Sequence, residues 1–255
     1  PYLKNKGSAV RFCLWPQIML KKYLKIIIPK TFLIKRYLFV RRKYSGQNFI
    51  DFKIRKYLNF DNGFFIEMGA LDGVMYSNTL HLEKYKNWKG LLVEPSKKQF
   101  ELCKQARPNS EVFNFLCSSF NNAGKEYLFY DLGPMSYSKF QNTDNQYQIH
   151  HENAKKVASS FNLNEESYYV KTRTITELLD SINSPKIINF FSLDVEGAEL
   201  EVLDGFDFTK YKIQYLLIES RDFNKTNDYL VSKGYIYIDS IEKINLLYGH
   251  HSLIN

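Results

Sequence analysis

Short apolar runs alternate with helical patterns from Gly63 onward, at a spacing of about 20 to 30 residues. The runs that fit buried strands are residues 64–68, 90–93, 112–116, 187–193 and 215–218. Two further runs, 235–238 and 246–248, fit a terminal antiparallel pair. This alternation is typical of repeated βα units, so the sequence predicts an α/β fold around a largely parallel sheet.

Two of the predicted helices begin at recognisable capping residues. Ser96 follows the second apolar run and can cap a helix that continues through Cys103. Thr174 and Glu177 have the spacing of a capping box, which predicts a helix before the run that begins at Ile187. Both signals support the βα order.

Residues 131–168 interrupt this order. They are polar, rich in Asn, Gln, Ser and Tyr, and show no clear strand period, while Gly133 and Pro134 mark a turn. We expect an insertion or lid here, within a domain that spans residues 61–255. It either covers a site or only connects two elements.

The composition is that of a folded globular chain. Of 255 residues, 44% are hydrophobic and 24% charged, which excludes a disordered chain, a collagen and a disulfide scaffold. Cys13, Cys103 and Cys117 are odd in number and form no C-x-x-C pair. They favour a reducing compartment, so we expect a cytoplasmic protein without a zinc site.

Positive charge is concentrated at the start of the chain. The first 60 residues hold fifteen Lys or Arg against one acid, Asp51, whereas the whole chain has a net charge of +8. We therefore expect a basic, helical arm at residues 1–60. Lys and Arg interrupt its apolar clusters, so it holds no run of about 18 apolar residues that could span a membrane. The arm fits contact with an anionic membrane surface or RNA, and equally packing on its own domain.

The most informative candidate site follows the first predicted strand. That strand runs directly into a turn with two acids, Glu67 and Asp72, and two glycines, Gly69 and Gly73. Glycine lets a ligand approach the backbone closely, and the carboxyl ends of parallel strands border the ligand crevice of such sheets. Because acids at this turn repel phosphate, a nucleoside or a ligand with a cationic group fits better than a pyrophosphate.

Other carboxylates also follow predicted strands. Glu94 ends the second run, where a carboxylate can accept hydrogen bonds from both hydroxyls of a ribose. Asp194 and Glu196 follow the run 187–193, and Glu219 follows the run 215–218. Together they predict a site for an adenosine-type ligand. A divalent metal is one way of satisfying the last three carboxylates, although we assign no metal ligands.

Four segments carry a resemblance to a known family. Residues 65–73 (FIEMGALDG), 77–79 (SNT), 88–95 (WKGLLVEP) and 192–199 (SLDVEGAE) resemble the FkbM family of S-adenosylmethionine-dependent methyltransferases, in the family's order and over roughly residues 62–234. The resemblance implies a Rossmann-like, seven-stranded class I methyltransferase sheet with helices on both faces. It further implies that the protein binds S-adenosylmethionine and methylates a hydroxyl group of a glycan or small molecule.

The resemblance also implies roles for individual residues. The cofactor turn would consist of Glu67, Gly69, Asp72 and Gly73. Glu94 would hold the ribose, Ser77 and Asn78 would lie beside the cofactor, and Cys117 and Ser118 would meet the adenine. Asp194 and Glu196 would lie near the transferred methyl group.

An alcohol acceptor must also lose its proton. Asp194 is our first candidate for the general base, with Glu196 or Glu219 orienting the acceptor. The histidines held in reserve for this role are His81, His150, His151, His250 and His251.

Two other functions stay open. One is an RNA ribose 2′-O-methyltransferase of the cap type, with Lys56, Asp194, Lys225 and Glu242 as its tetrad and the arm binding phosphates. The other is an inactive scaffold that keeps the methyltransferase fold, because a fold does not guarantee an activity.

Overall fold

The computed structural model describes residues 43–140 and 144–254. The chain divides into two units after Arg42, and residues 43–60 lie in the same unit as the rest of the domain. Within them, helix α3 (Ile50–Ile54) buries both of its terminal isoleucines. The part of the predicted arm at residues 1–42 lies outside the described residues.

The main sheet has seven strands in the order β10-β11-β9-β8-β1-β2-β3. Their bounds are β1 (Phe64–Met68), β2 (Lys89–Val93), β3 (Glu111–Phe113), β8 (Ile187–Leu193), β9 (Lys212–Glu219), β10 (Tyr235–Glu242) and β11 (Asn245–His250). Strand β11 pairs antiparallel with both β9 and β10, and the other pairings are parallel. The predicted sheet, including its terminal antiparallel pair, is confirmed.

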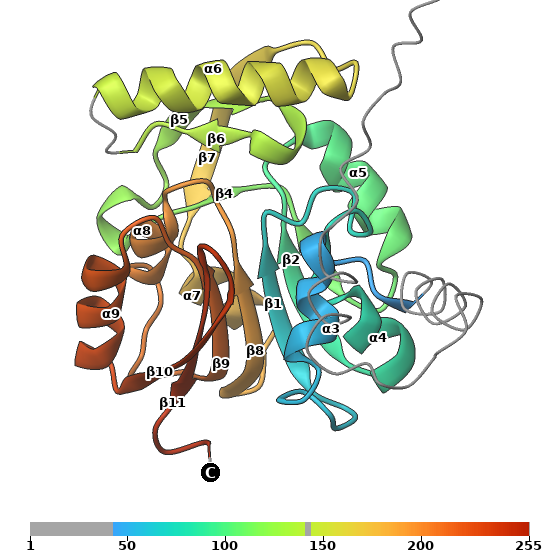
Figure 1. The fold of residues 1–255 in the computed structure, drawn as a ribbon, viewed down its shortest axis with the longest axis vertical. Coiled ribbons are helices and arrows are strands. Elements are labelled where there is room, and N and C mark those ends of the chain that lie inside the picture. The colour runs from blue at the N-terminus through green and yellow to red at the C-terminus, as the bar shows by residue number, and fades with distance from the viewer. Residues whose placement is uncertain (1–42, 141–143, 255) are drawn as a thin grey trace, which may run out of the picture. The chain divides into compact units, whose positions relative to one another are not determined.

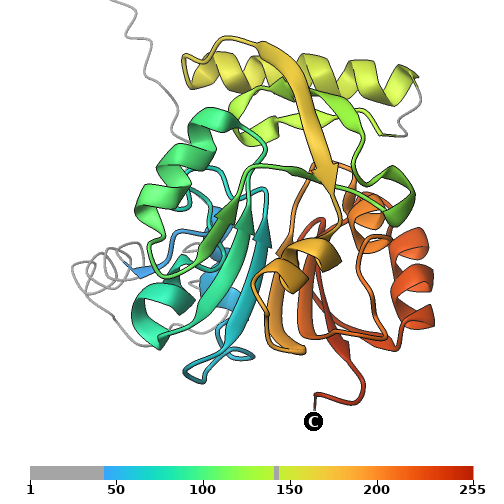
Figure 2. The ribbon, with the colours of Figure 1, turned by 180° about the vertical axis from the view of Figure 1, so that it is seen from behind.

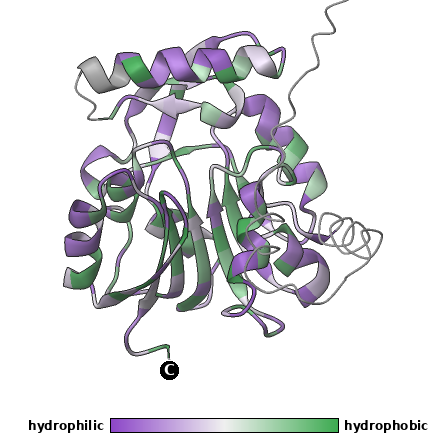
Figure 3. Cartoon of the chain, in the orientation of Figure 1, coloured by the Kyte–Doolittle hydropathy of each residue, from purple (hydrophilic) through white to green (hydrophobic). Residues whose placement is uncertain are grey.

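Helices cover both faces of this sheet (Figures 1 and 2). One face packs against α3, α4 (Leu80–Lys86) and α5 (Lys97–Ala106). The other packs against α7 (Ile175–Ser181), α8 (Glu199–Leu203) and α9 (Phe223–Ser232). Successive strand residues face opposite sides, so Phe65 joins one apolar cluster and Ile66 the other. Figure 3 shows the resulting apolar sheet between helices with polar outer faces.

Both predicted caps are present. Ser96 Oγ accepts from Gln99 N at the start of α5, and Thr174 and Glu177 form the complete capping box of α7. These side chains satisfy amide groups that the first helical turn leaves without partners.

A second, four-stranded sheet has the order β4-β7-β5-β6. Its strands are β4 (Leu116–Cys117), β5 (Glu126–Asp131), β6 (Tyr137–Ser138) and β7 (Glu166–Arg173), and helix α6 (Asp144–Ser160) lies across it (Figure 1). The described residues also form three short 3₁₀ helices: η1 (Gln47–Phe49), η2 (Phe120–Asn122) and η3 (Gly133–Met135). Leu132 and Tyr137 pack against Ala154 and Ala158 of α6 in a cluster of their own. The described part of segment 131–168 therefore contains regular structure, namely η3, β6, α6 and the start of β7.

The predicted strand 112–116 was also wrong, because the chain changes sheets there. Strand β3 ends at Phe113, and the Asn114 side chain donates to the carbonyl oxygens of Glu94 (2.8 Å) and Pro95 (2.9 Å). Leu116 then pairs in parallel with Thr172 of β7. The two bonds of Asn114 hold the chain at the break between the sheets.

The chain order reverses between β1 and β8. From β1 the chain builds β2 and β3 on one side, and it then returns to place β8 on the other side of β1. Such a switch point opens a ligand crevice at the carboxyl ends of the two strands. All the predicted strand-end acids lie at this edge. Within the described residues, no helix is long and apolar enough to cross a membrane.

Candidate functional site

A cavity of about 670 Å³ lies at the carboxyl ends of β1, β2, β8 and β9. Eight of the predicted site residues line it: Glu67, Gly69, Asn78, Glu94, Cys117, Asp194, Glu196 and Glu219. The opposite wall comes from the second sheet and α6, through residues that include Met135, Tyr137 and Phe161. Asp72, Gly73, Ser77 and Ser118 do not line the cavity.

The glycine turn brings the end of β1 against β8. Gly69 adopts φ +76°, and its α-carbon lies against the backbone of Asp194. Asp72 Oδ1 accepts from the amides of Val74 (2.9 Å) and Met75 (2.7 Å), so this carboxylate stabilises the turn.

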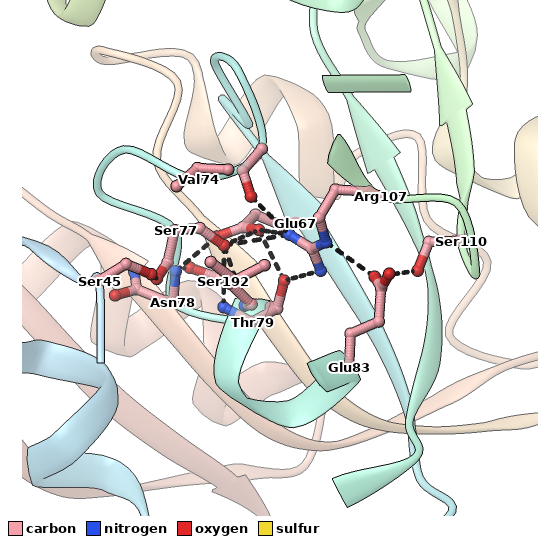
Figure 4. A network of polar contacts seen from close by, with 12 residues as sticks. Ser45, Glu67, Val74, Ser77, Asn78, Thr79, Glu83, Arg107, Ser110 and Ser192 are labelled. Atoms are coloured by element: carbon pink, nitrogen blue, oxygen red, sulfur yellow. Dashed lines mark hydrogen bonds and ion pairs between the residues drawn. The ribbon is translucent and has the colours of Figure 1, made fainter. Parts of the chain in front are cut away.

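Glu67 holds the S-N-T segment (Figure 4). Its carboxylate accepts from Ser77 Oγ (2.7 Å), Asn78 N (2.7 Å) and Thr79 Oγ1 (2.6 Å). Asn78 in turn donates from Nδ2 to Ser192 Oγ (3.0 Å), which ties the segment to β8. Glu67 therefore shapes the cavity by fixing the loop that borders it.

Arg107 is a residue that sequence reasoning missed. Its side chain is completely buried at the end of α5, where Nε donates to Glu83 Oε2 (2.7 Å) and Nη1 lies 3.4 Å from Glu67 Oε2. The same guanidinium donates to Gly73 O (3.1 Å) and Thr79 Oγ1 (2.9 Å) (Figure 4). A lone arginine near a helix end resembles a surface residue, and only the distant partners reveal its burial.

Glu94 lies at the end of β2 with 2% of its surface exposed. Its Oε2 accepts from Leu71 N (2.7 Å) and its Oε1 from Ser96 N (2.8 Å). Burial raises the pKa of this carboxyl to about 7, despite these two amide donors. Each carboxylate oxygen has about two acceptor positions, so the group can still accept from two ligand hydroxyls.

The second sheet is bonded to the same edge of the cavity through Asp131, a further residue that the sequence did not reveal. Ser96 Oγ donates to Asp131 Oδ2 (2.6 Å), and the Tyr168 hydroxyl donates to the same oxygen (3.0 Å). Asp131 and Tyr168 belong to the pair β5 and β7, so these bonds join the second sheet to the start of α5.

Three carboxylates converge where β8 and β9 end. Oxygens of Asp194, Glu196 and Glu219 lie within 4.8 Å of one another, close enough to share a divalent cation. Arg221 Nη2 donates to Glu196 Oε2 (2.6 Å) and lies 3.7 Å from Glu219 Oε1. Glu196 has φ +57°, a conformation that costs energy for a residue with a side chain and that is concentrated at functional sites.

Crowding changes the acidity of this cluster. Burial, with the neighbouring Glu219 carboxylate, raises the pKa of Asp194 well above its ordinary value. Burial and the charge of Glu219 also raise the pKa of Glu196 to about 8. A carboxyl with a pKa of about 8, as in Glu196, can gain or lose a proton near neutral pH, and strongly perturbed carboxyls such as these are typical of functional sites.

The five histidines considered as alternative general bases lie in different parts of the domain. His150 of α6 places Nδ1 3.9 Å from Glu196 Oε2. His81 stacks on Tyr44 at a centroid distance of 4.2 Å, and His250 and His251 lie at the opposite end of β11 from the cavity. His151 bonds the Tyr137 hydroxyl (2.8 Å). Of the five, His150 lies beside the carboxylate cluster.

The hypothetical RNA tetrad is not assembled. Asp194 and Glu242 line the cavity described above, whereas Lys225 lines a second cavity and Lys56 a third. Two lysines in separate cavities cannot act together on one acceptor.

Comparison with known proteins identifies one family. The family model described as the methyltransferase FkbM domain matches residues 67–237. A comparison with curated proteins gives no match.

Several solved structures are similar to this chain at low sequence identity. A precorrin-6y C5,15-methyltransferase from Geobacter metallireducens has a TM-score of 0.41 and 12% identity, covering 81% of this chain and 87% of its own. A methyltransferase from Geobacter sulfurreducens has a TM-score of 0.40 and 9% identity, covering 96% and 98%. The 23S rRNA methyltransferase ErmE has a TM-score of 0.40 and 9% identity, covering 83% and 72%. Structural similarity at this level does not identify the methyl acceptor of this chain.

Proposed function

The chain belongs to the FkbM methyltransferase family and is an S-adenosylmethionine-dependent methyltransferase, and we propose that its acceptor is a hydroxyl group of a glycan or another small molecule. The observation that carries this proposal is the cluster of Asp194, Glu196 and Glu219 in the wall of the cavity at the strand ends. An oxygen acceptor must lose a proton during methyl transfer, and this cluster provides a base.

The residues present fit S-adenosylmethionine. The cavity volume of about 670 Å³ is in the range of small-molecule sites. Buried Glu94 retains acceptor capacity for the two ribose hydroxyls. Gly69 has no side chain and adopts φ +76°, so the end of β1 lies against the backbone of Asp194 and shapes the crevice between β1 and β8. When bound, the cofactor supplies a methyl group on a positively charged sulfur.

The carboxylates next to this cavity suit a cationic ligand and an alcohol. Their negative charge favours a sulfonium group and disfavours a phosphate. Asp194, at the end of β8, would accept the proton of the acceptor hydroxyl, and Glu219 would orient that hydroxyl from the end of β9. Arg221 limits the repulsion within the cluster by pairing with Glu196.

Alignment is the larger contribution of the protein. The acceptor oxygen must lie about 3 Å from the methyl carbon and in line with the departing sulfur, and fixing that geometry lowers the barrier by several kcal/mol. The wall formed by η3 and α6 lies across the cavity from the strand ends, where it can exclude water from the reacting atoms.

The test has two stages. Calorimetry with S-adenosylhomocysteine on the wild type and on Glu94→Ala measures the cofactor site, and we expect saturable binding that the substitution weakens at least about tenfold. Radiolabelled methyl transfer from S-adenosylmethionine to neutral glycans, small alcohols and RNA then identifies the acceptor class.

Asp194→Asn provides the control for catalysis. We expect it to lower methyl transfer about 10²- to 10⁴-fold, the usual contribution of a general base, while S-adenosylhomocysteine still binds. Transfer to RNA alone, or full activity in Asp194→Asn, would overturn the proposal.

A further inference from the structure

A second cavity, of about 1020 Å³, adjoins the first beside the carboxylate cluster. The two share five lining residues: Met135, Phe140, Ala198, Glu219 and Arg221. Glu219 and Arg221 thus face both spaces, and a ligand in the second cavity would meet the cofactor cavity at Glu219, the proposed orienting group beside the base Asp194. We infer that the second cavity is the acceptor site and that it takes a neutral or amino sugar which His150 helps to recognise. This inference rests on the proposed function and names its substrate class.

His150 supplies the first indication of a ligand. Its side chain is 8% exposed and lines the second cavity, yet Nε2 has no hydrogen-bond partner among the described residues. A buried polar atom without a partner costs free energy, and a ligand hydroxyl removes that cost. Since a hydroxyl both donates and accepts, it suits either tautomer of the imidazole.

Apolar side chains at the same cavity supply the second indication. Phe223 is 44% exposed at the start of α9, and Ile149 is 65% exposed on α6. Both line the cavity, together with amide and hydroxyl side chains such as Asn153, Asn224 and Thr226. A sugar ring has an apolar C–H face and a rim of hydroxyls, so it matches exposed apolar side chains flanked by polar ones.

The charge of the lining disfavours a phosphorylated acceptor. Four acidic side chains (Glu199, Glu201, Glu219 and Asp222) and two basic ones (Arg221 and Lys225) line the cavity. The basic Arg221 is already paired with Glu196. Helix α9 begins here, but Asp222 caps it by accepting from Lys225 N (3.1 Å), which places a carboxylate where an anion would otherwise bind. A neutral or positively charged sugar therefore fits better than a sugar phosphate or RNA.

The test uses the full chain with ¹³C-labelled histidine and saturating S-adenosylhomocysteine. Calorimetry on the same sample first establishes whether S-adenosylhomocysteine binds. Failure of the proposed function, seen as no cofactor binding, is thereby distinguished from failure of the sugar inference. The NMR signal of His150, assigned with His150→Gln, is then followed during titration with methyl glycosides of neutral and amino sugars, and with glucose 1-phosphate. His250 and His251, at the far end of β11, serve as internal controls.

We expect at least one neutral or amino glycoside to shift the His150 signal saturably, and glucose 1-phosphate to bind at least tenfold more weakly. Phe223→Ala should weaken the glycoside at least threefold, whereas Val231→Ala, exposed on the same helix but outside the cavity, should not. If S-adenosylhomocysteine binds but no glycoside shifts His150, or if the phosphate binds more tightly, the inference is wrong.

Discussion

A β-carbon added to Gly69 would lie 2.1 Å from the carbonyl oxygen of Asp194. No side chain fits in that space, so the end of β1 approaches the end of β8 more closely than any other residue would allow. The two positions are far apart in the sequence but belong to neighbouring strands at the switch point. Their approach sets the geometry of the crevice in which we place the cofactor.

Gly69→Ala should therefore affect both the fold and the cofactor site. It combines a positive φ with a clash against backbone, and we expect a loss of about 3 kcal/mol in the free energy of unfolding. Affinity for S-adenosylhomocysteine should fall at least about tenfold. Urea denaturation and calorimetry measure the two effects. Gly124→Ala is the matched control, since Gly124 has φ +79° with nothing within 4 Å, and it should cost only about 1 kcal/mol and leave binding unchanged.

Cofactor binding should release protons from Glu94. The pKa of this carboxyl is raised to about 7, and ribose hydroxyls donate better to its ionised form, so binding lowers the pKa. At pH 7 we expect the release of about half a proton per S-adenosylhomocysteine bound. Calorimetry in buffers of different ionisation enthalpy measures this number. Glu94→Gln should abolish the release and Glu101→Gln, exposed on α5, should keep it; equal release in both variants would contradict the assignment.

Asp194→Asn should stabilise the protein while it abolishes catalysis. Because the pKa of Asp194 is raised in the folded state, the protein is more stable when this carboxyl is protonated. That stability is lost as the pH rises from the ordinary pKa of an aspartate through the raised pKa of the folded state. The neighbouring Glu196 has its own raised pKa of about 8, so the cluster carries more negative charge at pH 8 than at pH 5. We therefore expect the melting temperature of Asp194→Asn to exceed that of the wild type by ~2–4 °C at pH 8, for about 1 kcal/mol of relieved repulsion, and by less at pH 5. Thermal melts of both proteins at the two pH values test this prediction. A lower melting temperature of Asp194→Asn than of the wild type at pH 8 would show that the carboxylate is stabilising.

Arg107→Met should destabilise the domain strongly. It would leave the carboxylates of Glu67 and Glu83 buried without their cation, and breaking a buried pair in this way costs about 3–5 kcal/mol. Arg173→Met is the control, because Arg173 is partly exposed and lies 3.8 Å from Glu177, a surface pair for which we expect at most about 1 kcal/mol. Urea denaturation compares the variants. Similar losses in both would mean that burial of Arg107 contributes little.

The main sheet could be predicted because its strands are buried on both faces. Strands β1 and β8 begin and end at the predicted residues, since each is a predominantly apolar run that stops at a turn containing acids and glycine. The caps at Ser96 and Thr174 were also predictable, because a cap needs only residues three apart.

The second sheet and its bonds could not be predicted from local patterns. Strand β5 (EYLFYD) has only a short aromatic run and β7 (ESYYVKTR) mixes tyrosines with charged and hydroxyl residues, and most positions of both are partly or fully exposed, so neither looks like a buried strand. Asn114 likewise gives no local sign that the chain changes sheets after β3. Of the candidate site, the strand-end acids followed from the sequence, whereas the roles of Arg107, Asp131 and His150 depend on partners far away in the chain.

The pairing of β4 with β7 brings the start and the end of one long excursion side by side. Leu116 pairs with Thr172 and Cys117 with Arg173, so the segment 118–171 begins and ends at adjacent points of the domain. These residues supply α6 and much of the wall opposite the strand-end acids. A segment whose ends are neighbours can be lengthened, shortened or exchanged without a change in the strand order of the main sheet. We therefore expect that a chimera joined at these two positions can change the acceptor while it keeps the cofactor site.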